Sequence, residues 1–206
     1  MKPDLKEEKK LWKQGFKCVV GLDEAGRGPL AGPVVAAAVS IEPNCKILFE
    51  GINDSKKLSE KQRDFFYKKL IKNKNIPLGA QVKWGIGIVP EKIIDKINIL
   101  QATKLAMQKA VEKLEPDYLL LDGNFTINSI VRQKPVVRGD QKVISISCAS
   151  IIAKVTRDKI MKKMHKKYPQ YGFDKHKGYG TELHIKMLKK FGACPIHRKS
   201  FRLVYW

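Results

Sequence analysis

Four acidic residues stand at the ends of mainly apolar runs, and these residues are the best placed in the chain to do chemistry. Asp23 and Glu24 end one run, Asp122 ends a second and Asp140 ends a third, each with a glycine nearby. Carboxylates are unusual beside buried strands unless they are paired or bind a metal ion. If these strands are neighbours, the four carboxylates meet at one sheet edge, where their repulsion requires cations or raised pKa values.

A carboxylate cluster of this kind would select hard divalent cations. Oxygen ligands favour Mg²⁺ or Mn²⁺ over zinc. Two such ions, about 4 Å apart, can activate a water molecule and stabilise the leaving oxygen of a phosphodiester. The competing interpretation makes each acid a cap or turn residue at a strand end, and the acids taken singly leave both interpretations open.

The segment Gly26-Arg27-Gly28 follows the first two acids after a single alanine. A dinucleotide-binding loop does not fit here, because Asp23 and Glu24 would repel a pyrophosphate and Pro29 and Pro33 interrupt the region where a phosphate-binding helix begins. Two glycines without side chains instead let the backbone approach a substrate closely.

The elements that must position these residues alternate between strands and helices. Ser59 and Gln62 form a capping box at the start of one helix. Periodicity and turn residues predict strands over 16–22, 34–41, 81–89, 117–122 and 135–140, and helices over 59–72, 90–114, 145–167 and 181–191. After an opening antiparallel hairpin, this alternation predicts an α/β fold with a mixed central sheet.

Three parts are expected along the 206 residues. Residues 1–15 form a charged leader that is a short helix or a frayed end. Residues 16–160 form the α/β part. Residues 161–206 form a small, very basic helical extension packed on that part.

The net charge of +21 and the isoelectric point near 9.8 favour a polyanionic partner, most often nucleic acid. A lysine-rich composition that reflects codon usage or a hot habitat is the competing explanation. The lysine-dense segment 159–177 is expected to follow a phosphate backbone, although a solvated helix face would also account for many of its lysines.

Cysteine spacing and the lack of a long apolar run indicate a cytoplasmic protein with no membrane partner. Cys18, Cys45, Cys148 and Cys194 lie far apart without zinc-like spacing, which is typical of reduced thiols. The first 14 residues are charged and do not form a secretory signal, and no run reaches the roughly 20 apolar residues that span a bilayer.

Seven segments in order together resemble the type 2 ribonucleases H, specifically bacterial ribonuclease HII. They are residues 21–34, 54–59, 121–124, 139–140, 149–158, 176–181 and 197–201. The resemblance implies a ribonuclease H-like mixed five-stranded sheet flanked by helices, with a small C-terminal helical extension. Ribonuclease HIII carries an extra N-terminal domain, and since only 22 residues precede Asp23, we expect the HII type.

The resemblance places the family's metal-binding and catalytic carboxylates on Asp23, Glu24, Asp122 and Asp140. It implies an endoribonuclease dependent on two Mg²⁺ or Mn²⁺ ions that cleaves the RNA strand of RNA–DNA hybrids. It also implies nicking on the 5′ side of ribonucleotides embedded in duplex DNA, which leaves 3′-hydroxyl and 5′-phosphate ends.

Substrate-binding roles follow for a further set of residues. By resemblance, the backbone of Gly26, Arg27 and Gly28 reads the ribose 2′-hydroxyl, the group that separates RNA from DNA. Tyr179 stands between two glycines, so we expect an exposed ring, which the family places against the sugar beside the scissile phosphate; the alternative is a core tyrosine.

Polar residues elsewhere are expected to contact phosphates. Ser55 and Lys56 lie in a polar turn, and phosphate contacts there would position a duplex without reading its sequence. Lys154 is a further candidate, on one helix face with Ser150 and Asp158, where the competing role is an exposed ion pair with Asp158. His165, His176, His184 and His197 lack metal-pair spacing, and we expect His176 and His184 to be structural or peripheral.

Two other functions remain open at this point: a junction resolvase-like nuclease of the same fold, and a non-catalytic nucleic-acid-binding protein. Gly26-Arg27-Gly28 and Tyr179 argue against the resolvase, and the clustered acids argue against the binding protein. We expect a monomer that binds hybrids and ribonucleotide-containing duplexes. A sliding clamp is a further partner to consider, although the chain has no clear clamp-binding motif of the Gln-x-x-apolar-x-x-aromatic-aromatic type.

Overall fold

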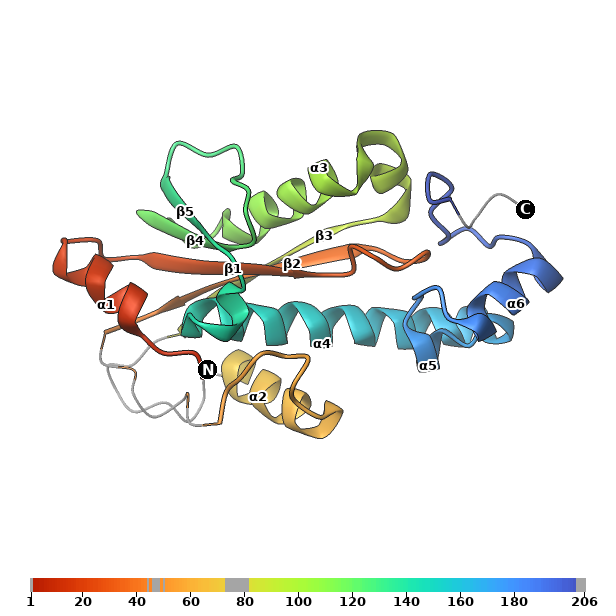
Figure 1. Ribbon diagram of the computed structural model, residues 1–206, viewed down its shortest axis with the longest axis horizontal. Helices are drawn as coiled ribbons and strands as arrows, with labels where there is room; N and C mark the ends of the chain where they lie inside the picture. The colour runs from red at the N-terminus through yellow and green to blue at the C-terminus, as the bar shows by residue number, and fades with distance from the viewer. Residues whose placement is uncertain (1, 44, 46–48, 50, 73–81, 203–206) are drawn as a thin grey trace.

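A five-stranded mixed sheet with helices on both faces forms the centre of the molecule in the computed structural model (Figure 1). The structure describes residues 2–43, 45, 49, 51–72 and 82–202. The strands are β1 (Val19–Ala25), β2 (Val34–Ile41), β3 (Val82–Val89), β4 (Tyr118–Asp122) and β5 (Arg132–Val136). The α-helices are α1 (Lys6–Lys13), α2 (Glu60–Lys72), α3 (Glu91–Val111), α4 (Ile144–Lys167), α5 (Phe173–His176) and α6 (Glu182–Phe191), and 3₁₀ turns lie at η2 (Gly139–Gln141) and η3 (Pro169–Tyr171).

The strand order β3-β2-β1-β4-β5 puts β1 in the middle of the sheet. β1 pairs antiparallel with β2 and parallel with β4, while β3 and β5 are the edges. The mixed sheet predicted from the sequence is therefore confirmed. A central strand paired on both sides is a rigid support for whatever side chains it carries.

Each face of the sheet has its own apolar core. On one face, Val20 and Leu22 of β1 pack with β2, β4 and α3. On the other face, Ala37 and Val39 of β2 pack with α2 and α4. Figure 1 shows the same two layers, with α3 on one side of the sheet and α2 and α4 on the other. Alternating residues of one strand thus point into different cores.

Two strand predictions need correction. β1 spans residues 19–25 rather than 16–22, because its ladder with β2 continues past the apolar run, pairing Asp23 with Ala37 and Glu24 with Ala36. β5 spans residues 132–136 rather than 135–140, because the left-handed backbone of Arg138 (φ 56°) turns the chain into a 3₁₀ helix. Both acids of β1 therefore lie within the strand, whereas Asp140 lies in a turn after β5. The expected strand start at Gln81 lies outside the described residues.

The helix expected over 90–114 ends at Val111 and contains a break. Asn98 has φ 65° and ψ 167°, which no α-helix accommodates. Its side-chain oxygen accepts hydrogen bonds from the backbone N–H groups of Leu100 and Gln101, at 3.0 and 3.1 Å. Asn98 therefore acts as an N-cap for the second half of α3.

The N-terminal residues are part of the fold. Asp4 forms an isolated bridge with Val143, and α1 buries Glu8 completely. The Glu8 carboxylate accepts a hydrogen bond of 2.9 Å from the backbone N–H of Ser145 in the first turn of α4. Residues 1–15 therefore carry a short helix, as one of the two expectations held, and this helix caps another; Met1 lies outside the described residues.

The basic C-terminal residues pack against the loop between β1 and β2. Leu30 and Ala31 of that loop share an apolar cluster with Met161, Phe173 and Leu188. α4 runs unbroken across residue 160, so the expected boundary falls inside one helix. We propose residues 161–206 as an extension packed on the α/β part; residues 203–206 lie outside the described part. No helix of the described residues is long and apolar enough to cross a membrane.

Candidate active site

β1 delivers two carboxylates to the end of the sheet. Asp23 is 5% exposed and lies on the face covered by α4, whereas Glu24 points to the other face. The backbone N–H of Glu24 donates to Asp23 Oδ1 at 2.7 Å. The two acids predicted as one half of the site are therefore held together by the strand itself.

Asp122 and Asp140 reach the same place from β4 and from η2. The register pairs Leu22 with Leu121, so Asp122 is level with Asp23 on the neighbouring strand. Asp122 Oδ1 accepts a 2.7 Å hydrogen bond from the backbone N–H of Gly139. A Cβ atom at Gly139 would lie 2.6 Å from Ile146 Cδ1, so the buried Ile146 side chain would have to shift, which favours glycine directly before Asp140.

Burial and mutual repulsion shift the pKa values of these acids upward. Burial raises the pKa of Asp23 well above its usual range, and the charges of Glu24 and Asp122 add to the effect. Burial also raises the pKa of Glu24 to about 7, against the opposing pull of Arg27. The pKa of Asp140 is raised by burial and then by Asp122. Acids this close stay ionised together only when a cation compensates them.

The donor set fits divalent cations. Glu24 Oε2 is buried and has no hydrogen-bond partner among the described residues, so one hard oxygen of the cluster has no protein donor. Within the described part of the chain, however, no three acidic, imidazole or thiol groups are already gathered into a finished metal site. β1, β4 and η2 bring the four predicted carboxylates together as neighbours. Their side chains would have to move closer to one another to bind an ion.

Lys56 lies next to the four carboxylates. Its ammonium lies 3.6 Å from Asp140 Oδ2, with the side chain 79% exposed. Burial would lower the pKa of Lys56, but the surrounding acids, led by Asp140, hold it above its usual value. An exposed cation beside the carboxylates suits the phosphate contact predicted for it.

Ser55 turns inward. It is 4% exposed, and its hydroxyl lies 2.8 Å from that of Ser150 in α4. A direct contact with a phosphate, as expected from the sequence, would require this pair to open. Ser150 also donates a hydrogen bond that lowers the pKa of Asp23, so Ser55 reaches the acids through Ser150.

Lys154 is occupied by a salt bridge. Its ammonium lies 2.7 Å from Asp158 Oδ1, with side chains 26% and 13% exposed. The ion pair considered as an alternative is therefore present, although it is largely buried rather than exposed. Burial lowers the pKa of Lys154, and its contact with a phosphate stays a prediction.

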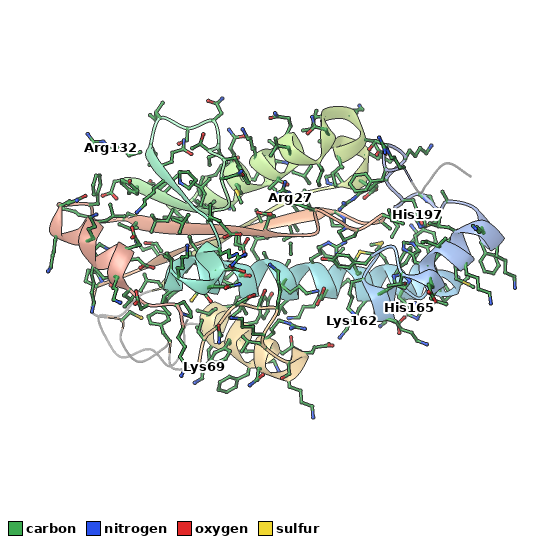
Figure 2. All side chains as sticks on the ribbon, viewed as in Figure 1. Arg27, Lys69, Arg132, Lys162, His165 and His197 are labelled. Carbon is green, nitrogen blue, oxygen red and sulfur yellow. The ribbon has the colours of Figure 1, made fainter. Side chains whose placement is uncertain are left out.

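The loop of residues 26–33, called the recognition loop after the role predicted for it, leaves β1 at Ala25, one residue after the acids. Gly26 has φ +102°, a conformation that residues with side chains rarely adopt. Arg27 is half-exposed and lies 3.5 Å from Glu24 Oε1. Figure 2 shows Arg27 on the side of the sheet that α3 covers, where its guanidinium lies 5.8 Å from the centroid of the Phe125 ring. The loop and the carboxylates are thus joined by an ion pair as well as by the chain.

Tyr179 lies beside the recognition loop and is 44% exposed, as predicted. A Cβ atom added to Gly28 would lie 3.8 Å from Tyr179 Cε1, so ring and loop face each other across a narrow gap. The backbone of Tyr179 is fixed by His176, whose carbonyl accepts from its N–H at 2.9 Å, and by His184, whose Nδ1 lies 2.9 Å from its carbonyl oxygen.

Three histidines form a buried cluster under Tyr179, and their role here is structural. The Nε2 atoms of His184 and His197 lie 3.0 Å apart, and the rings of His176 and His184 stack with centroids 4.4 Å apart. Burial lowers the pKa of both His184 and His197 to about 4. As neutral rings, His184 donates from Nδ1 to the Tyr179 carbonyl and accepts at Nε2 from His197 Nε2, and these bonds hold the C-terminal segments together.

Two buried arginines beside the site, Arg157 and Arg198, were missed from the sequence. They are 1% and 0% exposed, and their guanidinium groups bind backbone carbonyls of the recognition loop. A signal was available for Arg157, because it follows the apolar positions 151–153 and 155 of a helix that is buried there. An arginine in such a stretch needs several acceptors nearby.

Lysines line the solvent side of α4 beyond the site. Figure 2 shows Lys162 and His165 projecting from the C-terminal half of this helix. Lys162 pairs with Glu60 of α2 at 2.5 Å, whereas Lys163 and Lys166 are exposed. The exposed members of segment 159–177 are thus available to a phosphate backbone, and Lys162 is already engaged.

Comparisons with known proteins point to one family. A family model described as ribonuclease HII matches residues 20–204. The ribonuclease HII of Acetivibrio thermocellus is 54% identical over 196 residues, which cover 94% of this chain and 73% of that protein.

Solved structures share the fold. Ribonuclease H2 from Pyrococcus horikoshii superposes with a TM-score of 0.71 at 28% identity, covering 91% of this chain and 95% of that one. Ribonuclease HII from Archaeoglobus fulgidus, solved in complex with PCNA, gives 0.69 at 25% identity, with coverage of 84% and 87%. A ribonuclease HIII solved with Mn²⁺ gives 0.62 at 16% identity, with coverage of 91% and 68%, and supports the fold alone.

Proposed function

Since this chain belongs to the ribonuclease HII family, and is therefore an endonuclease of RNA–DNA hybrids, we propose that it is metal-dependent and also nicks duplex DNA at embedded ribonucleotides. The cut falls on the 5′ side of the ribonucleotide and leaves a 3′-hydroxyl and a 5′-phosphate. One observation carries the proposal: Arg27 of the recognition loop pairs with Glu24 at 3.5 Å, so the place that reads the sugar adjoins the carboxylates.

Asp23, Glu24, Asp122 and Asp140 would hold two Mg²⁺ or Mn²⁺ ions. When bound, such ions polarise a water molecule and neutralise the charge that develops on a phosphodiester. The raised pKa of Asp23 and the unpartnered Oε2 of Glu24 support this role, because a cation relieves both. Lys56, exposed above Asp140, adds positive charge where a phosphate would approach.

Recognition is proposed to combine the loop and the tyrosine. Backbone groups of Gly26, Arg27 and Gly28 would contact the 2′-hydroxyl, while Tyr179 packs against the adjoining sugar across the gap beside Gly28. Lys154 and the exposed lysines of α4 would contact phosphates without reading sequence. Together these contacts would admit a ribonucleotide to the carboxylates and position its 5′ phosphate.

The family assignment favours the nuclease over a non-catalytic binding protein and over a junction resolvase. Two further features stay proposals. The chain acts as a monomer in the cytoplasm, where its four cysteines, all free in the structure, would remain reduced. A clamp complex is known for the Archaeoglobus relative, but we assign no clamp site to this chain, whose residues 203–206 lie outside the described part.

The test is cleavage of a DNA duplex that carries one ribonucleotide, in Mg²⁺ and in Mn²⁺, with product ends mapped. Asp23→Asn should reduce cleavage by about 100-fold or more, because one ligand charge and one hard oxygen are lost. Asp64→Asn, an acid of α2 that lies beside Lys159 and Lys162 of α4, is the control and should cleave like the parent. Near-parent cleavage by Asp23→Asn would refute the metal assignment, and cutting of an all-DNA four-way junction in preference would favour the resolvase.

A further inference from the structure

Six hydrogen bonds tie two buried arginines to backbone carbonyls around the recognition loop. Each guanidinium uses all three of its nitrogens. Arg157 donates from Nε, Nη1 and Nη2 to the carbonyls of Pro33, Lys177 and Ala31, each at 3.0 Å. Arg198 donates from Nε, Nη1 and Nη2 to the carbonyls of Gly32, Arg27 and Gly26, at 2.9, 3.0 and 2.6 Å.

Such burial of a cation is costly unless its donors are satisfied. All six of these acceptors are neutral carbonyls, and burial lowers the pKa of Arg157 to about 10 and that of Arg198 to about 9. A Met or Leu would fill the same space without burying a charge. The arginines are therefore present because their planar guanidinium groups hold these backbone carbonyls. Five of the six carbonyls belong to residues 26–33.

Arg198 fixes the direction of the two peptide units next to the acids. In a trans peptide, the C=O and the following N–H point in opposite directions. Because Arg198 binds the carbonyls of Gly26 and Arg27 from inside, the N–H groups of Arg27 and Gly28 point away from it. Neither N–H donates a hydrogen bond within the described residues, and Arg27 and Gly28 are both exposed. Two free donors are therefore presented side by side.

Arg157 fixes the distance between the loop and Tyr179. It binds Ala31 and Pro33 on one side and the carbonyl of Lys177 on the other, and its Cζ lies 5.9 Å from the centroid of the Tyr179 ring. The loop has no slack here, because a Cβ on Gly26 would lie 2.1 Å from Arg157 Nε. The Arg157 side chain thus fixes the distance between Gly28 and Tyr179.

We infer that Arg157 and Arg198 are positioning residues for ribonucleotide recognition. Arg198 aims the free N–H groups of Arg27 and Gly28 at the 2′-hydroxyl, and Arg157 sets the distance between Gly28 and Tyr179, the ring against which the sugar packs. This inference rests on the proposed function, since it assigns the loop the reading of that hydroxyl.

Lysine substitutions at each arginine are the test. Arg157→Lys and Arg198→Lys keep the charge and the alkyl stem but cannot bind three carbonyls in one plane. Tyr171→Phe is the matched control, because its hydroxyl binds Gly192 in the same extension without touching the loop. The substrate is a DNA duplex with one ribonucleotide, and kcat and KM are measured in Mg²⁺ alongside the melting temperature.

Misplacement of the sugar should lower kcat by about 100-fold in each lysine variant, whereas KM, set largely by phosphate contacts, should change by less than about threefold. The amide resonances of Arg27 and Gly28 should move in Arg198→Lys, and the ring resonances of Tyr179 in Arg157→Lys. Tyr171→Phe should change neither kcat nor these resonances.

Several outcomes would overturn the inference. Folded lysine variants with the parent's kcat would do so, as would an increase in KM that accounts for the whole loss. Failure of both lysine variants to fold would also do so, because the arginines would then serve stability alone. A parent chain that cleaves RNA–DNA hybrids but not the single-ribonucleotide duplex would refute the proposed function as well.

Discussion

Gly26 is the position at which a single methyl group should do the most damage to the recognition loop. Its φ of +102° is strained for alanine, at a cost of about 1–3 kcal/mol. The new Cβ would also lie 2.1 Å from Arg157 Nε, 2.5 Å from Arg157 Cδ and 2.8 Å from the carbonyl oxygen of Pro33. Overpacking of this kind costs about 1–3 kcal/mol more.

Gly26→Ala should therefore lose about 2–6 kcal/mol of unfolding free energy, or about 5–20 °C in melting temperature for a chain of this size. Gly28→Ala is the matched control. Its φ is not in the left-handed region, and the nearest atom to its Cβ is Tyr179 Cε1 at 3.8 Å, so its melting temperature should stay within about 2 °C of the parent.

Thermal and urea unfolding followed by circular dichroism measure both variants under one set of conditions. Activity should separate from stability, since the Gly28 methyl group occupies the gap beside Tyr179 and should slow cleavage without unfolding the chain. If Gly26→Ala has the same melting temperature as the parent, Gly26 does not pack tightly against Arg157.

Three further predictions concern charge. Below pH 6.5 the unfolded chain protonates His184 and His197, whose folded pKa is about 4, so stability should fall between those values by up to about 3 kcal/mol per histidine, measured as melting temperature against pH. Burial raises the pKa of Glu8 above 4.5, so the stability that its protonated form gives the fold is complete below pH 4.5 and lost at higher pH. Glu8→Gln should therefore melt higher than the parent at pH 8 and equally at pH 4. Equal melting at pH 8 would contradict this. Lys163→Gln should weaken duplex binding equally for DNA and hybrid and lower the salt slope by about one.

The hydrophobic pattern predicted most elements because they are locally encoded. β2 was placed at residues 34–41, where an apolar run follows a proline and ends before another. All four acids were expected at neighbouring strand ends; β1 and β4 bring Asp23, Glu24 and Asp122 there, whereas Asp140 lies in η2 after β5. Apolar runs identify strands in the middle of a sheet well, since such strands are buried on both faces.

Elements that depend on their surroundings were harder to predict. β5 is an edge strand of mostly polar residues, so its first residues gave no apolar signal. The valines at 136 and 137 therefore placed the expected strand too close to the C-terminus. The left-handed Arg138 that ends it carries no local signal comparable to a glycine. Asn98 could have been recognised as a cap, because asparagine favours such positions, but the apolar face continues on both sides of it.

The arginines under the recognition loop show why part of the site was missed. Arg157 lies 124 residues from Pro33, and Arg198 lies 172 residues from Gly26. Neither has an acceptor within its own helix or turn among these six bonds, so spacing in the sequence cannot reveal the contact. The chemistry of the acids is local and recognisable, whereas the support of the loop is built only when the chain folds.

α4 sets the distance between the carboxylates and the recognition loop. One unbroken helix carries Ser150, next to Asp23, and Arg157, under the recognition loop. Seven residues at 1.5 Å each separate them by about 10 Å along the axis. Under the proposed function, the distance from the scissile phosphate to the sugar that the loop contacts would therefore be constant, and cleavage should fall at a single phosphate. One residue inserted between them would turn Arg157 by about 100° and uncouple the two ends.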